Sequence, residues 1–248
     1  MEPMLYTAMN GAQTDLSRQM ISSNNMANVN TPGFKEDIFA AESVYLTNTE
    51  GLDTGVALVV EEPNNTSVSP GPIMTTGRDL DVAVGQVNGW FAVGTGNGTE
   101  AYTRNGSFKL NANGLLTTTD DLPVLGDGGP ISIPPAQKVD IGTDGTISIV
   151  PLGGTPLEVV IIDRLKLVSL QPNQVYKNAA GLMQTKQGGN VPPDPNLTVV
   201  SGALEGSNVN AVEQMIDMIA ANREFEGQIK VMQTADDNAQ QLAQILQE

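Results

Sequence analysis

Residues 209–247 read VNAVEQMIDMIAANREFEGQIKVMQTADDNAQQLAQILQ, and their apolar side chains recur at intervals of three and four positions. The members of this series are Val212, Ile216, Ile219, Phe225, Ile229, Met232, Ala239, Leu242 and Leu246. Residues 4–28, MLYTAMNGAQTDLSRQMISSNNMAN, repeat the pattern with Leu5, Met9, Ala12, Leu16, Met20 and Ile21. Such spacing places the side chains on one face of a helix. Because a lone helix of this length is marginal in water, we expect the two ends to pair with each other and the middle to loop out between them.

The first helix is expected to run from about Pro3 to Met26. It should end before Pro32, which disfavours helix at the preceding residue, and Gly33 then permits a sharp change of direction. For residues 34–45 the sequence slightly favours a short further helix over irregular structure.

The second helix is expected to begin near Val209, with Ser207 or Asn208 as its N-cap. Gly227 lies inside this helix and costs about 1 kcal/mol relative to alanine. It either lets another backbone approach closely or is a neutral interruption, and the second interpretation is favoured.

The middle of the chain predicts a mostly antiparallel β domain. Asn-Gly and Asp-Gly pairs, which suit tight hairpins, recur at 88–89, 97–98, 105–106, 113–114, 127–128 and 144–145. Strands are predicted between them at 80–84, 90–93, 107–110, 115–119, 131–133, 146–150 and 164–170. The flanks read as a connector over 47–75 with at most one strand at 56–60, an irregular stretch over 171–197, and a last extended piece over 197–204.

These elements predict an α+β chain in four parts. They are an N-terminal helical part (1–38), an extended connector (39–75), a central all-β domain (76–204) and a C-terminal helical part (205–248).

The charge and composition argue against several functions. The chain carries 28 Asp and Glu against 12 Lys and Arg, a formal net charge of −16 that repels nucleic acid and anionic membranes. It has no Cys and no His, which removes thiol chemistry, the commonest general base and the commonest transition-metal ligand. We also expect no cleavable leader and no membrane-inserted segment.

Two motifs could be taken for ligand sites. The glycines of 94–98 follow a strand, but no Gly-Lys-Ser/Thr ending or helical pattern comes after them, so a hairpin loop is favoured over a phosphate loop. Asp120, Asp121, Asp127, Asp140 and Asp144 fit turn chemistry better than a calcium loop. We therefore expect no cofactor, no metal and no catalytic residues.

Two features of the helices favour packing between copies of the chain. Their apolar faces are rich in adaptable Met and small Ala. The side of the first helix expected to face solvent is almost uncharged, with Gln13, Thr14, Ser17, Gln19, Ser22 and Ser23. The asparagines at 24, 25, 28 and 30 either end the helix by bonding their own backbone or form amide contacts with neighbours, and both can hold.

Three ordered segments closely resemble the bacterial flagellar rod and hook family. The first is SNNMANVNTPGFK at 23–35, and the second comprises DLDVAV at 79–84, WFAV at 90–93 and YTRNGSF at 102–108. The third comprises LEGSNVN at 204–210, MIDMI at 215–219 and REFE at 223–226. Within the family, the length, Gly89-Trp90-Phe91 and the opening residues look most like a proximal rod subunit, with a distal rod subunit as the alternative.

This resemblance implies that the terminal helices pair in an α-helical coiled-coil domain that lines a helical tube, with the β domain outside. It also implies export by the flagellar type III apparatus without a cleaved signal peptide. The chain would reside in the basal body, in the rod that crosses the periplasm, and transmit torque. Its partners would be other proximal and distal rod subunits.

The expected subunit contacts are Leu5, Met9, Ala12, Leu16, Asn25, Asn28, Ile216, Ile219, Phe225, Ile229 and Leu242, with Pro32 and Gly33 setting the exit direction of the chain. A different class of function stays open, namely a secreted carbohydrate-binding or hydrolytic β domain on a helical stalk. That alternative needs exposed aromatics or a carboxylate cleft, and Trp90 is the only tryptophan.

Overall fold

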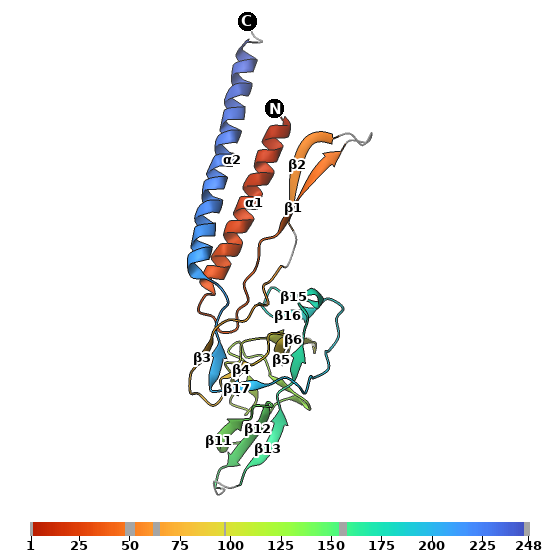
Figure 1. The fold of residues 1–248 in the computed structure, drawn as a ribbon, viewed down its shortest axis with the longest axis vertical. Helices are drawn as coiled ribbons and strands as arrows, with labels where there is room; N and C mark the ends of the chain where they lie inside the picture. The colour runs from red at the N-terminus through yellow and green to blue at the C-terminus, as the bar shows by residue number, and fades with distance from the viewer. Residues whose placement is uncertain (1, 48–52, 62–64, 97, 154–157, 246–248) are drawn as a thin grey trace. The chain divides into compact units, whose positions relative to one another are not determined.

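The computed structural model describes residues 2–47, 53–61, 65–96, 98–153 and 158–245, and has an α+β fold (Figure 1). The chain divides into two compact units. We call residues 1–27, 37–65 and 210–248 the helical unit, and residues 28–36 and 66–209 the β unit. The prediction for Leu246 lies outside the described residues.

The helical unit contains α1 (Glu2–Ala27), α2 (Ala211–Ile245) and a hairpin of β1 (Ala41–Thr47) and β2 (Asp53–Glu61). Both predicted helices are confirmed. The predicted N-cap is wrong, because the Asn210 side chain accepts the Val212 N–H at 3.1 Å and α2 starts two residues later than expected.

The helix favoured for 34–45 is also wrong, since β1 occupies part of this segment. Asn25 holds the backbone of Asp37 at both its N–H and its carbonyl, each at 2.9 Å. The Ile38 N–H then donates to the Asn65 carbonyl, and β2 pairs with β1. These partners are distant in the sequence, and they outweigh a weak local preference for helix.

The β unit is built from antiparallel strand pairs. Its largest sheet has the order β14-β5-β6-β16-β15, formed by β5 (Gly89–Gly94), β6 (Glu100–Thr103), β14 (Leu167–Ser169), β15 (Val175–Lys177) and β16 (Met183–Thr185). A second sheet contains β11 (Ala136–Ile141), β12 (Thr146–Pro151) and β13 (Val160–Arg164). The two-stranded pairs are β3 (Ile73–Thr75) with β18 (Ala203–Glu205), β4 (Val82–Val84) with β17 (Val199–Ser201), β7 (Lys109–Leu110) with β8 (Leu116–Thr117), and β9 (Leu125–Gly126) with β10 (Gly129–Pro130).

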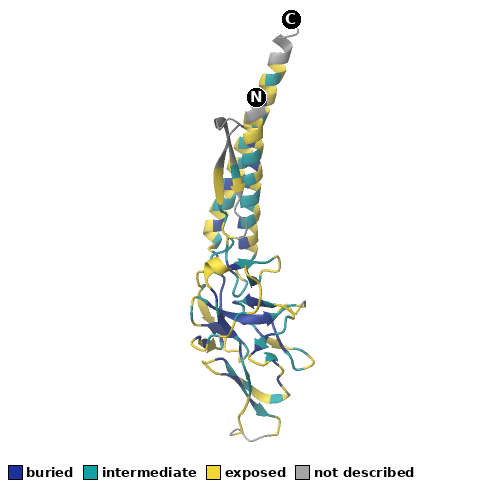
Figure 2. Ribbon diagram, turned by 90° about the vertical axis from the view of Figure 1, so that its right-hand side faces the viewer, coloured by how far each residue is buried: buried dark blue, intermediate teal, exposed yellow. Residues whose placement is uncertain are grey.

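Two hydrophobic clusters fill the β unit, and Figure 2 shows its buried positions concentrated on the strands. Phe91 and Phe108 meet edge to face in the larger cluster, with ring centroids 5.2 Å apart. Trp90 and Tyr102 lie in the other cluster. The alternation of β5 therefore sends neighbouring aromatic side chains into two separate clusters.

Several element boundaries in both units depart from the prediction. The stretch 171–197 holds a short 3₁₀ helix (Pro172–Gln174), β15 and β16, and the connector over 47–75 holds β2 and β3. Residues 131–133 contribute buried Ile131 and Ile133 but form only an isolated bridge. Five strands, β6, β9, β10, β11 and nearly all of β13, were not predicted, because these short segments lack a strict alternation of polar and apolar residues.

Candidate functional site

In the helical unit α1 packs on α2 through small and polar residues. The buried positions of α1 are Ala8, Ala12, Asp15, Ser22 and Asn25, and those of α2 are Gln214, Ala221 and Ala235. A Cβ added to Gly11 would lie 2.8 Å from the Gln228 Nε2, so the Gln228 side chain of α2 packs against α1 at this glycine. The Asn25 side chain also donates to Gln214 Oε1 at 3.0 Å.

Ten large apolar side chains on α1 and on the first turns of α2 are exposed. They are Met4, Leu5, Tyr6, Met9, Leu16 and Met20 on α1, and Val212, Met215, Ile216 and Ile219 near the start of α2. Met20 is 66% exposed and Val212 is 67% exposed. We call these ten residues the apolar surface of the helical unit.

The expectation that the apolar stripes cover each other is therefore wrong for most of their large members. Ser22, expected to face solvent, is instead buried. Small side chains allow the closer approach of two helix backbones, and the bulkier side chains are left outside. Large exposed apolar patches on proteins are typical of interaction sites.

The other predicted contact residues are distributed between the two units. Ala12 and Asn25 are buried in the helical unit, where Phe225 and Ile229 are half-buried. Asn28 belongs to the β unit and accepts the Thr31 hydroxyl at 3.1 Å. The side chain of Leu242 lies outside the described residues.

The predicted turn at Pro32-Gly33 also belongs to the β unit. Gly33 has a φ of 69°, and its N–H donates to the Glu205 carbonyl at 2.7 Å. An added Cβ would lie 2.3 Å from the Arg104 backbone, so no side chain fits there.

A charged cluster that the sequence did not predict lies between α1 and α2. Asp15 is buried beside Glu224, and both burial and this second carboxylate raise the pKa of Asp15. Asp15 Oδ2 has no hydrogen-bond partner among the described residues. Arg18 pairs with Glu224 at 3.0 Å and lies 4.0 Å from Asp217. The available signal was the position of Asp15, three residues after Ala12 of the apolar series, which places both on one side of the helix.

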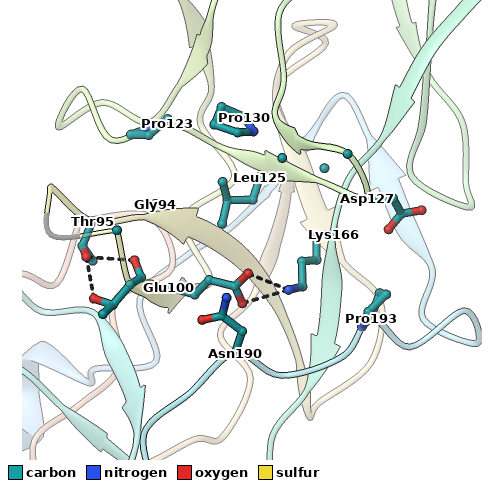
Figure 3. Close-up of a pocket in the computed structure, with 15 residues that line it drawn as sticks. Gly94, Thr95, Glu100, Pro123, Leu125, Asp127, Pro130, Lys166, Asn190 and Pro193 are labelled. Carbon is teal, nitrogen blue, oxygen red and sulfur yellow. Dashed lines mark hydrogen bonds and ion pairs between the residues drawn. The ribbon is translucent and has the colours of Figure 1, made fainter.

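A cavity of about 510 Å³ lies in the β unit, beside the loop between β5 and β6 (Figure 3). Its lining includes Pro123, Leu125 and Pro130, and its principal charged pair is Lys166 with Glu100. The Lys166 Nζ lies 2.6 and 2.8 Å from the two Glu100 oxygens, so each charge already has its partner. Asp127 also lines the cavity, and a single carboxylate beside a satisfied ion pair does not by itself make a binding site.

The motifs considered as ligand sites have structural roles. Gly94 and Glu100 are paired across the β5–β6 hairpin, as the favoured hairpin interpretation predicts. Asp144 accepts bonds from the Thr146 hydroxyl and N–H, which lower its pKa, and Asp121 pairs with Lys109 at 2.9 Å. Among the described residues, no cluster of acidic side chains has the arrangement of a metal site.

The alternative of a carbohydrate-binding domain requires exposed aromatic side chains. Among the described residues of the β unit, Trp90, Phe91, Tyr102 and Phe108 are buried in the core, and Phe34 and Tyr176 are half-buried. Within the described part of the chain, neither helix combines the length and the apolar character that crossing a membrane requires.

Comparison with known proteins places the chain in one family. Three family models match, described as "Flagella basal body rod protein" over residues 5–35, "Flagellar hook protein FlgE/F/G D1 domain" over 86–149 and "Flagellar basal body rod FlgEFG protein C-terminal" over 200–245. The flagellar basal-body rod protein FlgF of Escherichia coli K12 is 41% identical over 253 residues that cover 99% of each chain. FlgF of Salmonella typhimurium LT2 is 39% identical with the same coverage, and the rod protein FlgG of Bacillus subtilis 168 is 31% identical over 97% of this chain and 98% of its own. This chain therefore belongs to the family of flagellar basal-body rod proteins, and it is most like the members named FlgF.

Proposed function

We propose that this chain is a structural subunit of the proximal rod, and that it joins neighbouring rod subunits through the apolar surface of its helical unit. The observation that carries the proposal is the exposure of large apolar side chains on helices that pair through small ones. Covering apolar area stabilises association by about 25 cal/mol per Å². A contact between unlike surfaces of successive copies builds a helical tube when its rotation does not close into a ring, and this is the arrangement that we propose.

In this proposal α1 and α2 form a coiled-coil domain of the assembled rod. The buried residues Gln214, Ala221 and Ala235 are spaced at multiples of seven along α2, as are Ala8, Asp15 and Ser22 along α1, and a seven-residue repeat is typical of coiled coils. The remaining predicted contacts, including Phe225, Ile229 and Leu242, would extend the interface along α2.

The same proposal assigns the chain's route and its partners. It is exported by the flagellar type III apparatus without a cleaved leader, and it occupies the part of the basal body that crosses the periplasm. It then assembles with proximal and distal rod subunits and transmits torque. Before assembly its terminal helices are only weakly ordered, because their apolar surface has not yet been covered.

The absence of cysteine from the chain permits a direct test by cross-linking. Leu16→Cys and Ile216→Cys place single thiols within the apolar surface, whereas Asn113→Cys places one on an exposed turn of the β unit. On mild oxidation, purified basal bodies that contain both Leu16→Cys and Ile216→Cys subunits should give cross-linked subunits. Basal bodies that contain Asn113→Cys subunits should give none. Dilute free protein should give none with any variant.

Absence of cross-links from the assembled Leu16→Cys and Ile216→Cys variants would contradict the proposed interface. Absence of the chain itself from purified basal bodies would contradict the proposed function. An immunoblot of the same fraction separates these two outcomes.

A further inference from the structure

A buried carboxylate in the β unit, Glu205 at the end of β18, is held by two cations from distant parts of the chain. Glu205 Oε1 lies 2.6 Å from the Lys35 Nζ, and Oε2 lies 3.0 Å from the Arg104 Nη1. The side chains of Lys35, Arg104 and Glu205 are only 3%, 1% and 2% exposed. We call these three residues the buried triad.

Backbone groups complete the surroundings of the buried triad. Glu205 Oε1 also accepts the Gly71 N–H at 2.9 Å, and Lys35 donates to the Ser69 carbonyl at 2.7 Å. The Arg104 guanidinium donates to the carbonyls of Gln86 and Val87 and lies 5.2 Å from the centre of the Trp90 ring. Every charge is thus hydrogen-bonded, although the Arg104 Nε has no partner among the described residues.

Asn208 lies three residues after Glu205 and binds the segments that contain Lys35 and Ser69. Its Oδ1 accepts the Glu36 N–H at 2.8 Å, and its Nδ2 donates to the carbonyls of Ser67 and Ser69 at 3.2 and 3.1 Å. The Ser67 N–H in turn donates to the Glu36 carbonyl at 2.8 Å. The segments 28–36, 66–71 and 205–209 are therefore tied together within the β unit.

These three segments are the ones through which the chain leaves the β unit. Residues 28–36 are continuous with α1 on one side and with the β1–β2 hairpin on the other, residue 66 follows that hairpin, and residue 209 precedes α2. Each member of the buried triad also falls in a different family-model match, with Lys35 in 5–35, Arg104 in 86–149 and Glu205 in 200–245. The three matched segments are thus joined through one carboxylate.

The energetics make Glu205 the central member. One carboxylate compensates two buried cations, and burial lowers the pKa of both Lys35 and Arg104. Neutralising Glu205 leaves two desolvated cations without an anion, which is far more costly than losing an exposed ion pair.

We infer that Glu205 is a positioning residue of the rod subunit: by holding Lys35 and Arg104 it fixes, at one point of the β unit, every segment that leads to the helices. This inference rests on the proposed function, because it makes the buried triad the point at which force on the helices enters the β unit. It also means that a stable β unit includes residues 28–36, 66–75 and 205–209 in addition to the central domain expected at 76–204.

The test is amide hydrogen exchange on the purified full-length chain with Glu205→Gln, a change that removes the charge and keeps the shape. Glu226→Gln, on an exposed position of α2, is the matched control. We expect exchange at Gly33, Glu36, Ser67 and Gly71 to become about 100- to 1000-fold faster in Glu205→Gln. The core amide of Ala92 should stay protected, and the control should match the wild type.

Unchanged exchange at those four amides would overturn the inference. If Glu205→Gln unfolds the whole β unit, Lys35→Met decides, because it leaves the Arg104–Glu205 pair in place. Faster exchange confined to 28–36 and 66–71 in Lys35→Met supports the inference, and exchange equal to the wild type overturns it.

A second measurement relates the buried triad to the rod. In cells whose only copy is Lys35→Met, we expect the chain to enter basal bodies but swimming speed in viscous medium to fall more than that of the Glu226→Gln control. Equal swimming speeds of the Lys35→Met and Glu226→Gln cells would contradict a mechanical role for the buried triad. If even the wild-type chain is missing from basal bodies, the proposed function fails while the exchange result still stands.

Discussion

Ile219→Asp tests whether the apolar surface of the helical unit joins neighbouring subunits. Ile219 is 50% exposed on α2, so about half of its side chain is available to be covered by a neighbour. Complete burial of an isoleucine contributes about 1.5–3 kcal/mol, and the exposed half therefore contributes about 1 kcal/mol. Losing that half and burying an unpaired carboxylate together cost about 3–5 kcal/mol per contact. We expect association to weaken on the order of 10²- to 10³-fold.

The assay is the amount of the chain in purified basal bodies, measured by immunoblot against the wild type, together with swimming. Gln233→Asp adds the same charge at an exposed polar position of α2, and Ile219→Leu keeps the apolar character. Both controls should assemble normally. Thermal unfolding of the β unit should be unchanged in all three variants, because that unit ends at residue 209. Normal incorporation and swimming of Ile219→Asp would refute the reasoning.

Three further substitutions test individual contacts. The raised pKa of Asp15 means that, between its ordinary and raised values, the folded state keeps a proton that the unfolded state has released, so the stability of the helical unit falls as pH rises through that window. Asp15→Asn should remove this pH dependence and raise the free energy of unfolding at neutral pH by about 1–3 kcal/mol, because the amide can donate to Glu224. Thermal melts followed by α-helical circular dichroism at several pH values measure this stability. An unchanged or lowered melting midpoint at neutral pH would contradict the prediction. Gly33→Ala should lower the free energy of unfolding of the β unit, measured in urea, by more than about 2 kcal/mol. Gly77→Ala has a similar φ of 73° and nothing within 4 Å of the added Cβ, so it should cost about 1 kcal/mol. Equal costs would show that the close approach of the Arg104 backbone to Gly33 is unimportant. Gly227→Ala has open space around its Cβ and should stabilise the free helix by about 1 kcal/mol. If this variant is not incorporated into basal bodies, another backbone approaches Gly227 in the rod and the neutral interpretation is wrong.

The location of both helices could be predicted from the sequence because the helical period is a local property. Residues three and four apart share a face whatever lies beyond them, so the apolar series of 4–28 and 209–247 places α1 and α2 correctly to within about two residues. The turn at Pro32-Gly33 follows from equally local chemistry. The expectation that nucleic acid is not a partner depended only on the count of charges.

Which face of each helix is buried was decided by the tertiary structure. Periodicity shows that Leu16 and Ile219 each lie on the apolar face of their own helix. It does not show whether the partner helix or a neighbouring molecule covers that face. Close approach of the backbones favoured Ala8, Ala12 and Ser22 at the pairing face. The same approach buried Asp15, which composition alone would place in solvent.

The buried triad is the clearest case of a feature that only the folded chain reveals. Lys, Arg and Glu are separately most often exposed, and 69 and 101 positions separate Lys35, Arg104 and Glu205 along the chain. Local pattern carries no signal for three charges that meet across such distances. Burial of the three charged side chains becomes favourable only when they are in contact, because their attraction then offsets the desolvation free energy of each.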